Sequence, residues 1–200
     1  MSARDEILAS VRAALGPQRR EVVVPPRPTS PAVADLDLFV GRVVDYRATV
    51  VRCGDTDGDV ERAIAEAVPP GARVVVPPEL PWRVDGAVVD DGDLTAVDLD
   101  SIDVVVTGST VSIATTGTIV LSHGPGEGRR ALTLVPDLHV CVVRADQVVA
   151  DLPQAVELLD PRRPTTWISG PSATSDIELD RVEGVHGPRT LHVIVVGGAG

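Results

Sequence analysis

The chain has 200 residues, enough for one domain with a substantial buried core, and Val, Leu, Ile and Ala supply most of its apolar content. Its formal net charge of −11 and pI of about 4.7 disfavour nucleic acid and anionic membranes as partners, because both would repel an acidic surface. Its two cysteines, Cys53 and Cys141, lie far apart, which excludes a zinc ribbon, a CxxC redox site or an iron–sulfur cluster held by this chain alone.

The N-terminal residues predict an amphipathic helix followed by a linker. Apolar residues recur at helical spacing from Ile7 to Leu15, and Gly16-Pro17 stops the pattern. The stretch GPQRREVVVPPRPTSP that follows contains five prolines and no period, which is typical of an extended linker. We therefore expect residues 1–31 to form this arm and residues 32–200 to form the main domain. No apolar run approaches the ~20 residues that span a bilayer, and the charged N-terminus is unlike a signal peptide, so we expect a cytoplasmic protein.

From residue 32 onward, helical and strand patterns alternate. Helices are expected at 36–47, 55–68, 152–160 and 175–182, and strands at 49–53, 73–77, 101–110, 116–123, 165–170 and 190–196. Residues 138–149 are expected to form a strand with a second short one close behind, and residues 84–93 a strand and turn. Strands that are apolar almost throughout and alternate with helices predict an α/β domain with a mostly parallel sheet covered on both faces. Residues 116–136 are expected to form a local antiparallel excursion. In such sheets ligands bind beyond the carboxyl ends of strands, which points to residues 107–109 and 170–174.

The segment SGPSATSDIELD is the first candidate ligand site. Ser175 and Glu178 fit a capping box, and Gly170 and Ser172 leave a strand toward the predicted helix start. A helix N-terminus presents unpaired N–H groups that suit a carboxylate or a phosphate. The alternative is that Ser172, Thr174 and Ser175 only satisfy the turn and the cap.

The segment GVHGPR is the second candidate. His186 can titrate near neutral pH and relay a proton, and the Arg189 guanidinium can hold a carboxylate through two hydrogen bonds. The alternative is a rigid Gly-Pro turn whose histidine and arginine face solvent. His192 lies inside a predicted strand and is expected to pack in the core.

The third candidate surrounds Thr116, Gly117 and Thr118, which offer hydroxyls and backbone N–H groups at a tight bend. The Gly-x-Gly-x-Gly run that follows does not open a helix after a strand, so it is unlike a dinucleotide-binding loop. Arg129 and Arg130 end this run and either receive an anion or pair with surface carboxylates. The four histidines lack metal-ligand spacing, and we expect no metal site.

Taken in order, TTGTIVL, Arg129 with ALTLVPDLHVCVV, ISGPSATSDIE and GVHGPR resemble the lactate utilization protein C family, which carries the LUD domain. The resemblance covers residues 100 to 196. It implies a three-layer α/β/α fold like that of ribose-phosphate isomerases and CoA-transferases. It also implies a role in oxidising L-lactate to pyruvate with two partner subunits that carry iron–sulfur clusters. Two positions depart from the family pattern: Thr115, where members often have Glu, and Ala173, where a basic residue is frequent.

Three functions follow as hypotheses. The first is a carboxylate-binding or accessory subunit of a lactate-oxidising system without a cofactor of its own. Its ligand would be bound by Thr116, Gly117, Thr118, Arg129, Gly170, Ser172, Thr174, His186 and Arg189. The second is an autonomous enzyme acting on a sugar phosphate or an acyl-CoA, which rests on superfamily analogy. The third is an assembly protein whose N-terminal arm docks partners.

Overall fold

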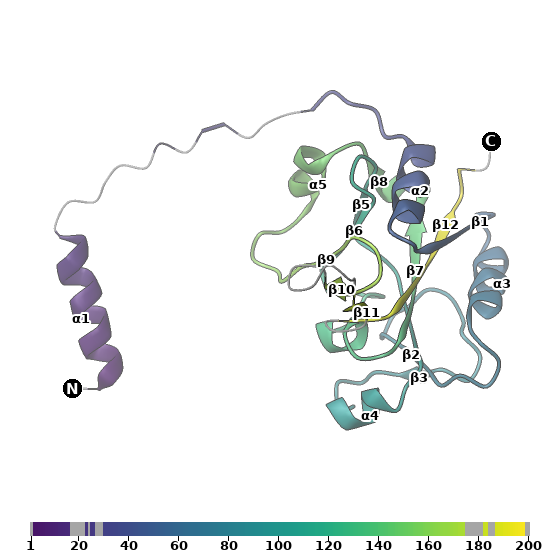
Figure 1. The fold of residues 1–200 in the computed structure, drawn as a ribbon, viewed down its shortest axis with the longest axis horizontal. Helices are drawn as coiled ribbons and strands as arrows, with labels where there is room; N and C mark the ends of the chain where they lie inside the picture. Colours follow the sequence, from purple (N-terminus) through teal and green to yellow (C-terminus); the bar gives the residue numbers. More distant parts are fainter. Residues whose placement is uncertain are drawn as a thin grey trace.

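The main sheet of the protein contains six parallel strands (Figure 1). The structure, a computed structural model of the chain, describes residues 2–16, 23, 25–26, 30–174, 182–183 and 187–198, with the backbone alone at 173–174 and 182–183. The strands run in the order β1 (Thr49–Cys53), β12 (Thr190–Val196), β7 (Leu138–Arg144), β4 (Val104–Thr107), β2 (Val74–Val76) and β3 (Val88–Val89).

A smaller sheet lies beside the main one. Its four strands run in the order β8 (Val148–Val149), β5 (Val111–Ile113), β6 (Thr118–Leu121) and β9 (Thr166–Ile168). Strand β6 is antiparallel to both of its neighbours, as expected for the excursion after residue 116. Two further strands, β10 (Ala173–Thr174) and β11 (Val182–Glu183), form an antiparallel pair.

The helices begin where the sequence supplies a capping side chain. They are α1 (Ala3–Leu15), α2 (Leu36–Asp45), α3 (Asp57–Ala67), α4 (Ala96–Asp100) and α5 (Leu152–Leu158), with the 3₁₀ turns η1 (Arg130–Thr133) and η2 (Ala145–Gln147). Asp35, Thr56, Thr95 and Asp151 each accept a hydrogen bond from a backbone N–H in the first turn of the helix that follows.

The core is layered around the main sheet. On one face, Val60 and Ile64 of α3 pack against Val142 of β7. On the other face, Phe39 of α2 and Ile119 of the four-stranded sheet pack in a second cluster. Helix α5 covers the outer side of the four-stranded sheet through Ala155. The expected layered α/β fold with a parallel sheet covered on both faces is therefore confirmed.

The element predictions differ from the structure in three places. Helix α4 was not expected, because only five residues form it and its acidic residues hide the apolar period. Strand β5 was not separated from its neighbours, because Val111–Ile113 has no distinctive alternation. The helix expected at 175–182 lies largely outside the described residues, and Val182 belongs to β11 instead.

The N-terminal helix α1 stands apart from the sheets (Figure 1). None of its residues is buried, although its Ser2 N-cap forms a complete capping box with Asp5. No helix in the part of the chain that the structure describes is long and apolar enough to cross a membrane.

Candidate functional site

An open groove of about 530 Å³ lies at the carboxyl ends of the strands β2 and β3. Five segments line it: residues 78–79, 90–92, 123–125, 128–130 and 163–164. We call it the carboxyl-edge groove. Open α/β sheets bind their ligands at the carboxyl ends of the strands, because loops diverge there and leave a crevice. The groove is therefore the main candidate site of the fold.

The loop at residues 122–128 forms one wall of the groove, and a buried carboxylate shapes it. Glu127 is 5% exposed and accepts hydrogen bonds from the Thr110 hydroxyl, from the Ser122 N–H at 2.6 Å and from the Gly124 N–H at 3.4 Å. Three donors satisfy the charge of a carboxylate that burial would otherwise penalise. Glu127 thus sets the path of the loop rather than facing a ligand.

Backbone bonds attach the same loop to the sheet edge. The Gly108 N–H, just beyond β4, donates to the Gly126 carbonyl at 2.8 Å, and the Gly126 N–H donates to the Pro78 carbonyl at 3.1 Å. Gly128 has a φ of +69°, and a Cβ at this position would lie 2.8 Å from Pro77 Cβ. Only glycine allows both this conformation and this close approach.

Two residues of the groove hold a left-handed backbone although they are not glycine. Glu79 has a φ of 60° and His123 a φ of 54°. Such residues are uncommon, cost of order 1–3 kcal/mol and cluster at ligand sites. The His123 Nδ1 donates to the Gly128 carbonyl at 2.9 Å, and its Nε2 lies 2.9 Å from the Thr166 hydroxyl. Both ring nitrogens are engaged, so His123 ties the loop to β9.

The cations of the groove fall into two kinds. Arg129 is committed to Asp90, which is 3% exposed, through Nε–Oδ2 at 2.8 Å and Nη2–Oδ1 at 3.0 Å. These hydrogen bonds raise the pKa of Arg129. Arg163 reaches only the His123 carbonyl, at 3.4 Å, and the Arg130 guanidinium has no partner among the described residues. Arg130 and Arg163 therefore remain available to an anion, whereas Arg129 does not.

Polar groups also lie beneath the loop, but they are sealed from solvent. The Thr107 hydroxyl lies 2.8 Å from His139 Nε2 and 3.9 Å from Cys141 Sγ. Burial lowers the pKa of His139 to about 4 and raises the pKa of Cys141 to about 12. A neutral imidazole and a protonated thiol that no substrate reaches form part of the core and not a nucleophilic centre.

Of the predicted site residues, Thr116, Gly117 and Thr118 lie at the far end of β6 from the groove. The two hydroxyls lie 2.8 Å apart, and Thr118 Oγ1 lies 3.0 Å from the Ser169 hydroxyl. We call residues 115–118 the hydroxyl turn. Gly117, with a φ of +63°, packs so closely on α2 that a Cβ there would lie 2.6 Å from Arg42 Cβ. Strand β6, which separates this turn from His123, spans about 10 Å at 3.3 Å per residue.

Gly170 packs on the end of α2, as the hydroxyl turn packs on α2. Ser172, in contrast, lies near the amino ends of the main-sheet strands. A Cβ on Gly170 would lie 2.5 Å from Tyr46 Cβ, at the end of α2. The Ser172 N–H donates to the Pro188 carbonyl at 2.9 Å. Pro188 precedes β12, so this contact lies at the amino edge of the main sheet. The loops predicted to carry Ser172 and Arg189 are therefore neighbours.

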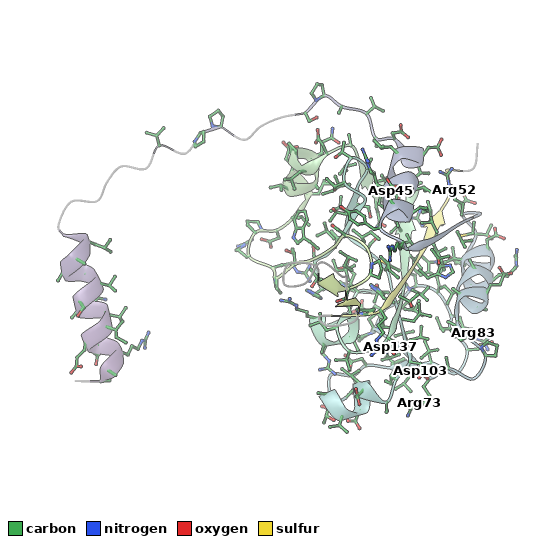
Figure 2. The ribbon with its side chains drawn as sticks, viewed as in Figure 1. Asp45, Arg52, Arg73, Arg83, Asp103 and Asp137 are labelled. Carbon is green, nitrogen blue, oxygen red and sulfur yellow. The ribbon has the colours of Figure 1, made fainter. Side chains whose placement is uncertain are left out.

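Arg189 lies at the same amino edge and pairs with Asp137 at 3.2 Å, with both side chains more than 60% exposed. Figure 2 shows Asp137 near Asp103 and Arg73 at this edge, far from Arg52 near the end of β1. Arg129, which follows the carboxyl-edge loop, is thus on the opposite edge from Arg189. The structure does not bring these two arginines around one ligand. His186 lies outside the described residues, as does the side chain of Thr174.

The sequence analysis did not single out several residues that line or shape the groove. Asp90 lies in the segment expected to form a strand and turn, but no local pattern marks its side chain as part of a site, and Arg163 has no local signal at all. His123 directly follows the apolar strand 118–121, and Glu127 lies inside the glycine run. The rule on carboxyl ends pointed to residues 107–109; Gly108 contacts the loop that carries both, although none of these three residues lines the groove.

Among the described residues, no group of three or more histidine, cysteine or acidic side chains is placed to hold a metal ion. Cys53 and Cys141 are both unpaired; Cys141 is buried and Cys53 is partly buried.

Comparison with known proteins identifies the relatives of the chain. The LUD domain family matches residues 39–196. A Deinococcus radiodurans protein named lactate utilization protein C is 45% identical over 206 residues, covering 98% of this chain and 96% of its own. A protein of the same name from Shouchella clausii is 36% identical over 101 residues, covering 47% of this chain and 44% of its own.

A solved structure agrees with the fold. The crystal structure of a DUF162 family protein from Deinococcus radiodurans at 1.70 Å resolution is 40% identical, with a TM-score of 0.70. The alignment covers 81% of this chain and 96% of that one.

Proposed function

Since the chain belongs to the LUD domain family, we propose that it is a subunit of a system that oxidises L-lactate to pyruvate and that it binds a small carboxylate in the carboxyl-edge groove. The observation that carries the proposal is the 45% identity over nearly the whole chain to a protein named lactate utilization protein C. Relatives with this name support a role in lactate utilization.

The chemistry of the groove supports a small anionic ligand. Arg130 and Arg163 are the cations there that no carboxylate of the described residues neutralises. A guanidinium binds a carboxylate through two parallel hydrogen bonds, which fixes the orientation of the ligand as well as its position. Glu79 and Asp91 also line the groove and would repel a ligand with several negative charges. A monocarboxylate such as lactate or pyruvate fits this balance better than a phosphate ester.

The electrons of the reaction must then pass through other proteins. Most iron–sulfur clusters need four cysteine ligands, and this chain contains two cysteines. We assign the clusters to partner subunits, and to this chain a role in binding or presenting the carboxylate. Co-purification of a tagged chain with iron–sulfur proteins from cells grown on lactate tests this division of roles.

A genetic experiment tests the physiological role. Deletion of the gene is expected to abolish growth on L-lactate and to leave growth on glucose unchanged. Complementation with the wild-type chain and with Arg162→Ala is expected to restore growth, whereas Arg163→Ala restores it poorly. Arg162 is a matched control, because it is 90% exposed, pairs with Asp160 and does not line the groove. Normal growth of the deletion strain on L-lactate would refute the proposal.

The alternative of an autonomous sugar-phosphate or acyl-CoA enzyme makes a different prediction. Under our proposal, pyruvate or L-lactate raises the melting temperature of the isolated chain by preferential binding to the folded state. Stabilisation by a sugar phosphate or coenzyme A, with both monocarboxylates inert, would favour the alternative instead.

A further inference from the structure

The carboxyl-edge groove contains two of the three non-glycine residues that the described part of the chain holds in the left-handed backbone region. These two are Glu79 and His123, with φ of 60° and 54°, and the third, Arg47, follows α2. Glycine would adopt this conformation without strain, and strained residues of this kind collect at ligand sites. Each of the two groove residues therefore needs a reason for having a side chain.

The two residues differ in what their side chains do. Both ring nitrogens of His123 are bonded, one to the Gly128 carbonyl and one to the Thr166 hydroxyl, so this side chain stabilises the loop. The Glu79 side chain is exposed, and no described residue donates a hydrogen bond to its carboxylate or forms an ion pair with it. Contacts within the described chain therefore do not explain why glutamate rather than glycine occupies this position.

The other two carboxylates of the groove are already engaged. Asp90 is paired with Arg129, and Asp91 Oδ1 accepts a hydrogen bond from the Asp93 N–H at 3.0 Å. Among the described residues, Glu79 is thus the acid of the groove with both carboxylate oxygens available to a ligand.

The backbone holds Glu79 near one of the available guanidiniums. The Gly126 N–H donates to the Pro78 carbonyl at 3.1 Å, and a Cβ on Gly126 would lie 3.4 Å from the Glu79 carbonyl oxygen. On the same loop, a Cβ on Gly124 would lie 3.5 Å from Arg163 Nη2. Gly124 and Gly126 are two residues apart, so at most about 7 Å of chain separates the two contacts. Glu79 and Arg163 therefore line the same short stretch of the groove.

An available carboxylate near an available guanidinium favours a ligand with two complementary groups. The carboxylate of a 2-hydroxy acid accepts hydrogen bonds from Arg163, and its hydroxyl, on the next carbon, donates to Glu79. A 2-oxo acid has a carbonyl oxygen at that position, which only accepts hydrogen bonds and is repelled by the Glu79 carboxylate. A site built to hydrogen-bond a substrate hydroxyl discriminates against the analogue that lacks it.

We propose that Glu79 determines specificity in the groove, by making it prefer L-lactate, a 2-hydroxy acid, to pyruvate, the corresponding 2-oxo acid. This role of Glu79 rests on the proposed function, since it takes the groove as the monocarboxylate site. It also gives that function a direction, because the chain then binds the substrate of the oxidation in preference to its product.

Calorimetric titration of the full chain with sodium L-lactate and with sodium pyruvate, at equal ionic strength, measures the preference as a ratio of dissociation constants. The wild-type chain is expected to bind L-lactate about tenfold more tightly, because one charge-assisted hydrogen bond distinguishes the two acids. Glu79→Gln keeps the size of the side chain, but its amide can donate to the pyruvate carbonyl and accept from the lactate hydroxyl. The ratio should therefore fall to about one.

Glu157→Gln is the matched control. Glu157 is exposed on α5 and does not line the groove, so this variant should keep the wild-type ratio.

The variant Glu79→Gly separates the ligand role from a structural one. Glycine relieves the left-handed strain, so the midpoint of urea unfolding should be unchanged or higher while the preference for L-lactate is lost. A lower midpoint would show that the side chain stabilises the fold, and it would overturn the role in specificity.

The titrations separate two kinds of failure. Equal affinities for the two acids in the wild-type chain, or a preference that survives Glu79→Gln, would overturn the role of Glu79 and leave carboxylate binding in place. A wild-type chain that binds neither acid would overturn the role of Glu79 together with the proposed function.

Discussion

Two glycine-containing turns lie at opposite ends of β6, and they differ in what they contact. The hydroxyl turn at residues 115–118 packs on the backbone of α2, and its Thr116 and Thr118 hydroxyls bond to each other and to Ser169. The loop at residues 122–128 lies over the carboxyl ends of the main sheet and borders an open groove with two available guanidiniums. Both segments look like ligand loops in the sequence, because both combine glycine with polar residues.

The difference shows that residue type alone does not identify a site. In the hydroxyl turn, other residues of the chain satisfy the polar atoms and fill the space that glycine leaves. In the loop at 122–128, hydrogen bonds satisfy Glu127 and His123, while beside it no carboxylate of the described residues pairs with Arg130 or Arg163. A polar segment can bind a ligand when tertiary packing leaves some of its groups unsatisfied at an accessible surface.

The largest expected effect tests the tight packing of the hydroxyl turn. Gly117→Ala should destabilise the protein by about 3–4 kcal/mol, because it adds left-handed strain to a clash with Arg42. Gly86→Ala is the control, since Gly86 has a φ of +72° and open space around it, and should cost about 1 kcal/mol. Urea unfolding measures both. Equal losses would show that the turn is not packed as described.

The next effect concerns the wall of the groove. Arg129→Ala leaves Asp90 buried and without its counter-charge, which should cost about 3 kcal/mol. Arg83→Ala breaks an ion pair with Asp85 in which both side chains are at least 80% exposed, and should cost less than about 1 kcal/mol. Adding Asp90→Asn to Arg129→Ala should recover part of the stability. Urea unfolding without such recovery would contradict the role of Arg129 as a structural counter-ion.

The pH dependence of stability tests the sealed interior beneath the loop. Burial lowers the pKa of His139 to about 4 from 6.5, so the unfolded chain binds a proton that the folded chain does not. Stability is therefore lost as pH falls below 6.5, by about 2 kcal/mol at pH 5, and the loss levels off near pH 4. Burial also lowers the pKa of His192, which adds a contribution of the same sign.

Urea unfolding at several pH values measures this dependence. The variant His139→Gln should flatten the slope between pH 6.5 and 4 whatever its stability at neutral pH. An unchanged slope in that variant would show that His139 is not the group responsible.

The smallest expected effect concerns ligand binding in the carboxyl-edge groove. Arg163→Ala should weaken the binding of pyruvate by about tenfold, or about 1.4 kcal/mol, because one charge-assisted contact is lost. Arg162→Ala and Thr116→Ala should leave binding within about twofold, a few tenths of a kcal/mol. Calorimetric titration measures all three. A loss in Thr116→Ala equal to that in Arg163→Ala would move the ligand to the hydroxyl turn.

Much of the architecture could be predicted, because local periodicity carries it. The strands at 49–53 and 190–196 are continuous apolar runs, and α2 and α3 follow acidic or hydroxyl caps with an apolar face. The site could be predicted less well. Arg129 was expected to hold a ligand, but it pairs with Asp90, which follows β3 and lies 39 residues earlier, and no local pattern predicts that pairing.

The sequence by itself determined the alternation of helices and strands, the parallel core and the N-terminal helix, because these depend on the spacing of apolar residues along a local segment. Tertiary structure alone decided which polar residues face a groove, because that depends on contacts between distant segments. His123 is engaged by Gly128 and Thr166, and Arg163 reaches the same loop from 40 residues away. Whether a charge is paired or available is a property of these three-dimensional neighbours and not of the motif that contains it.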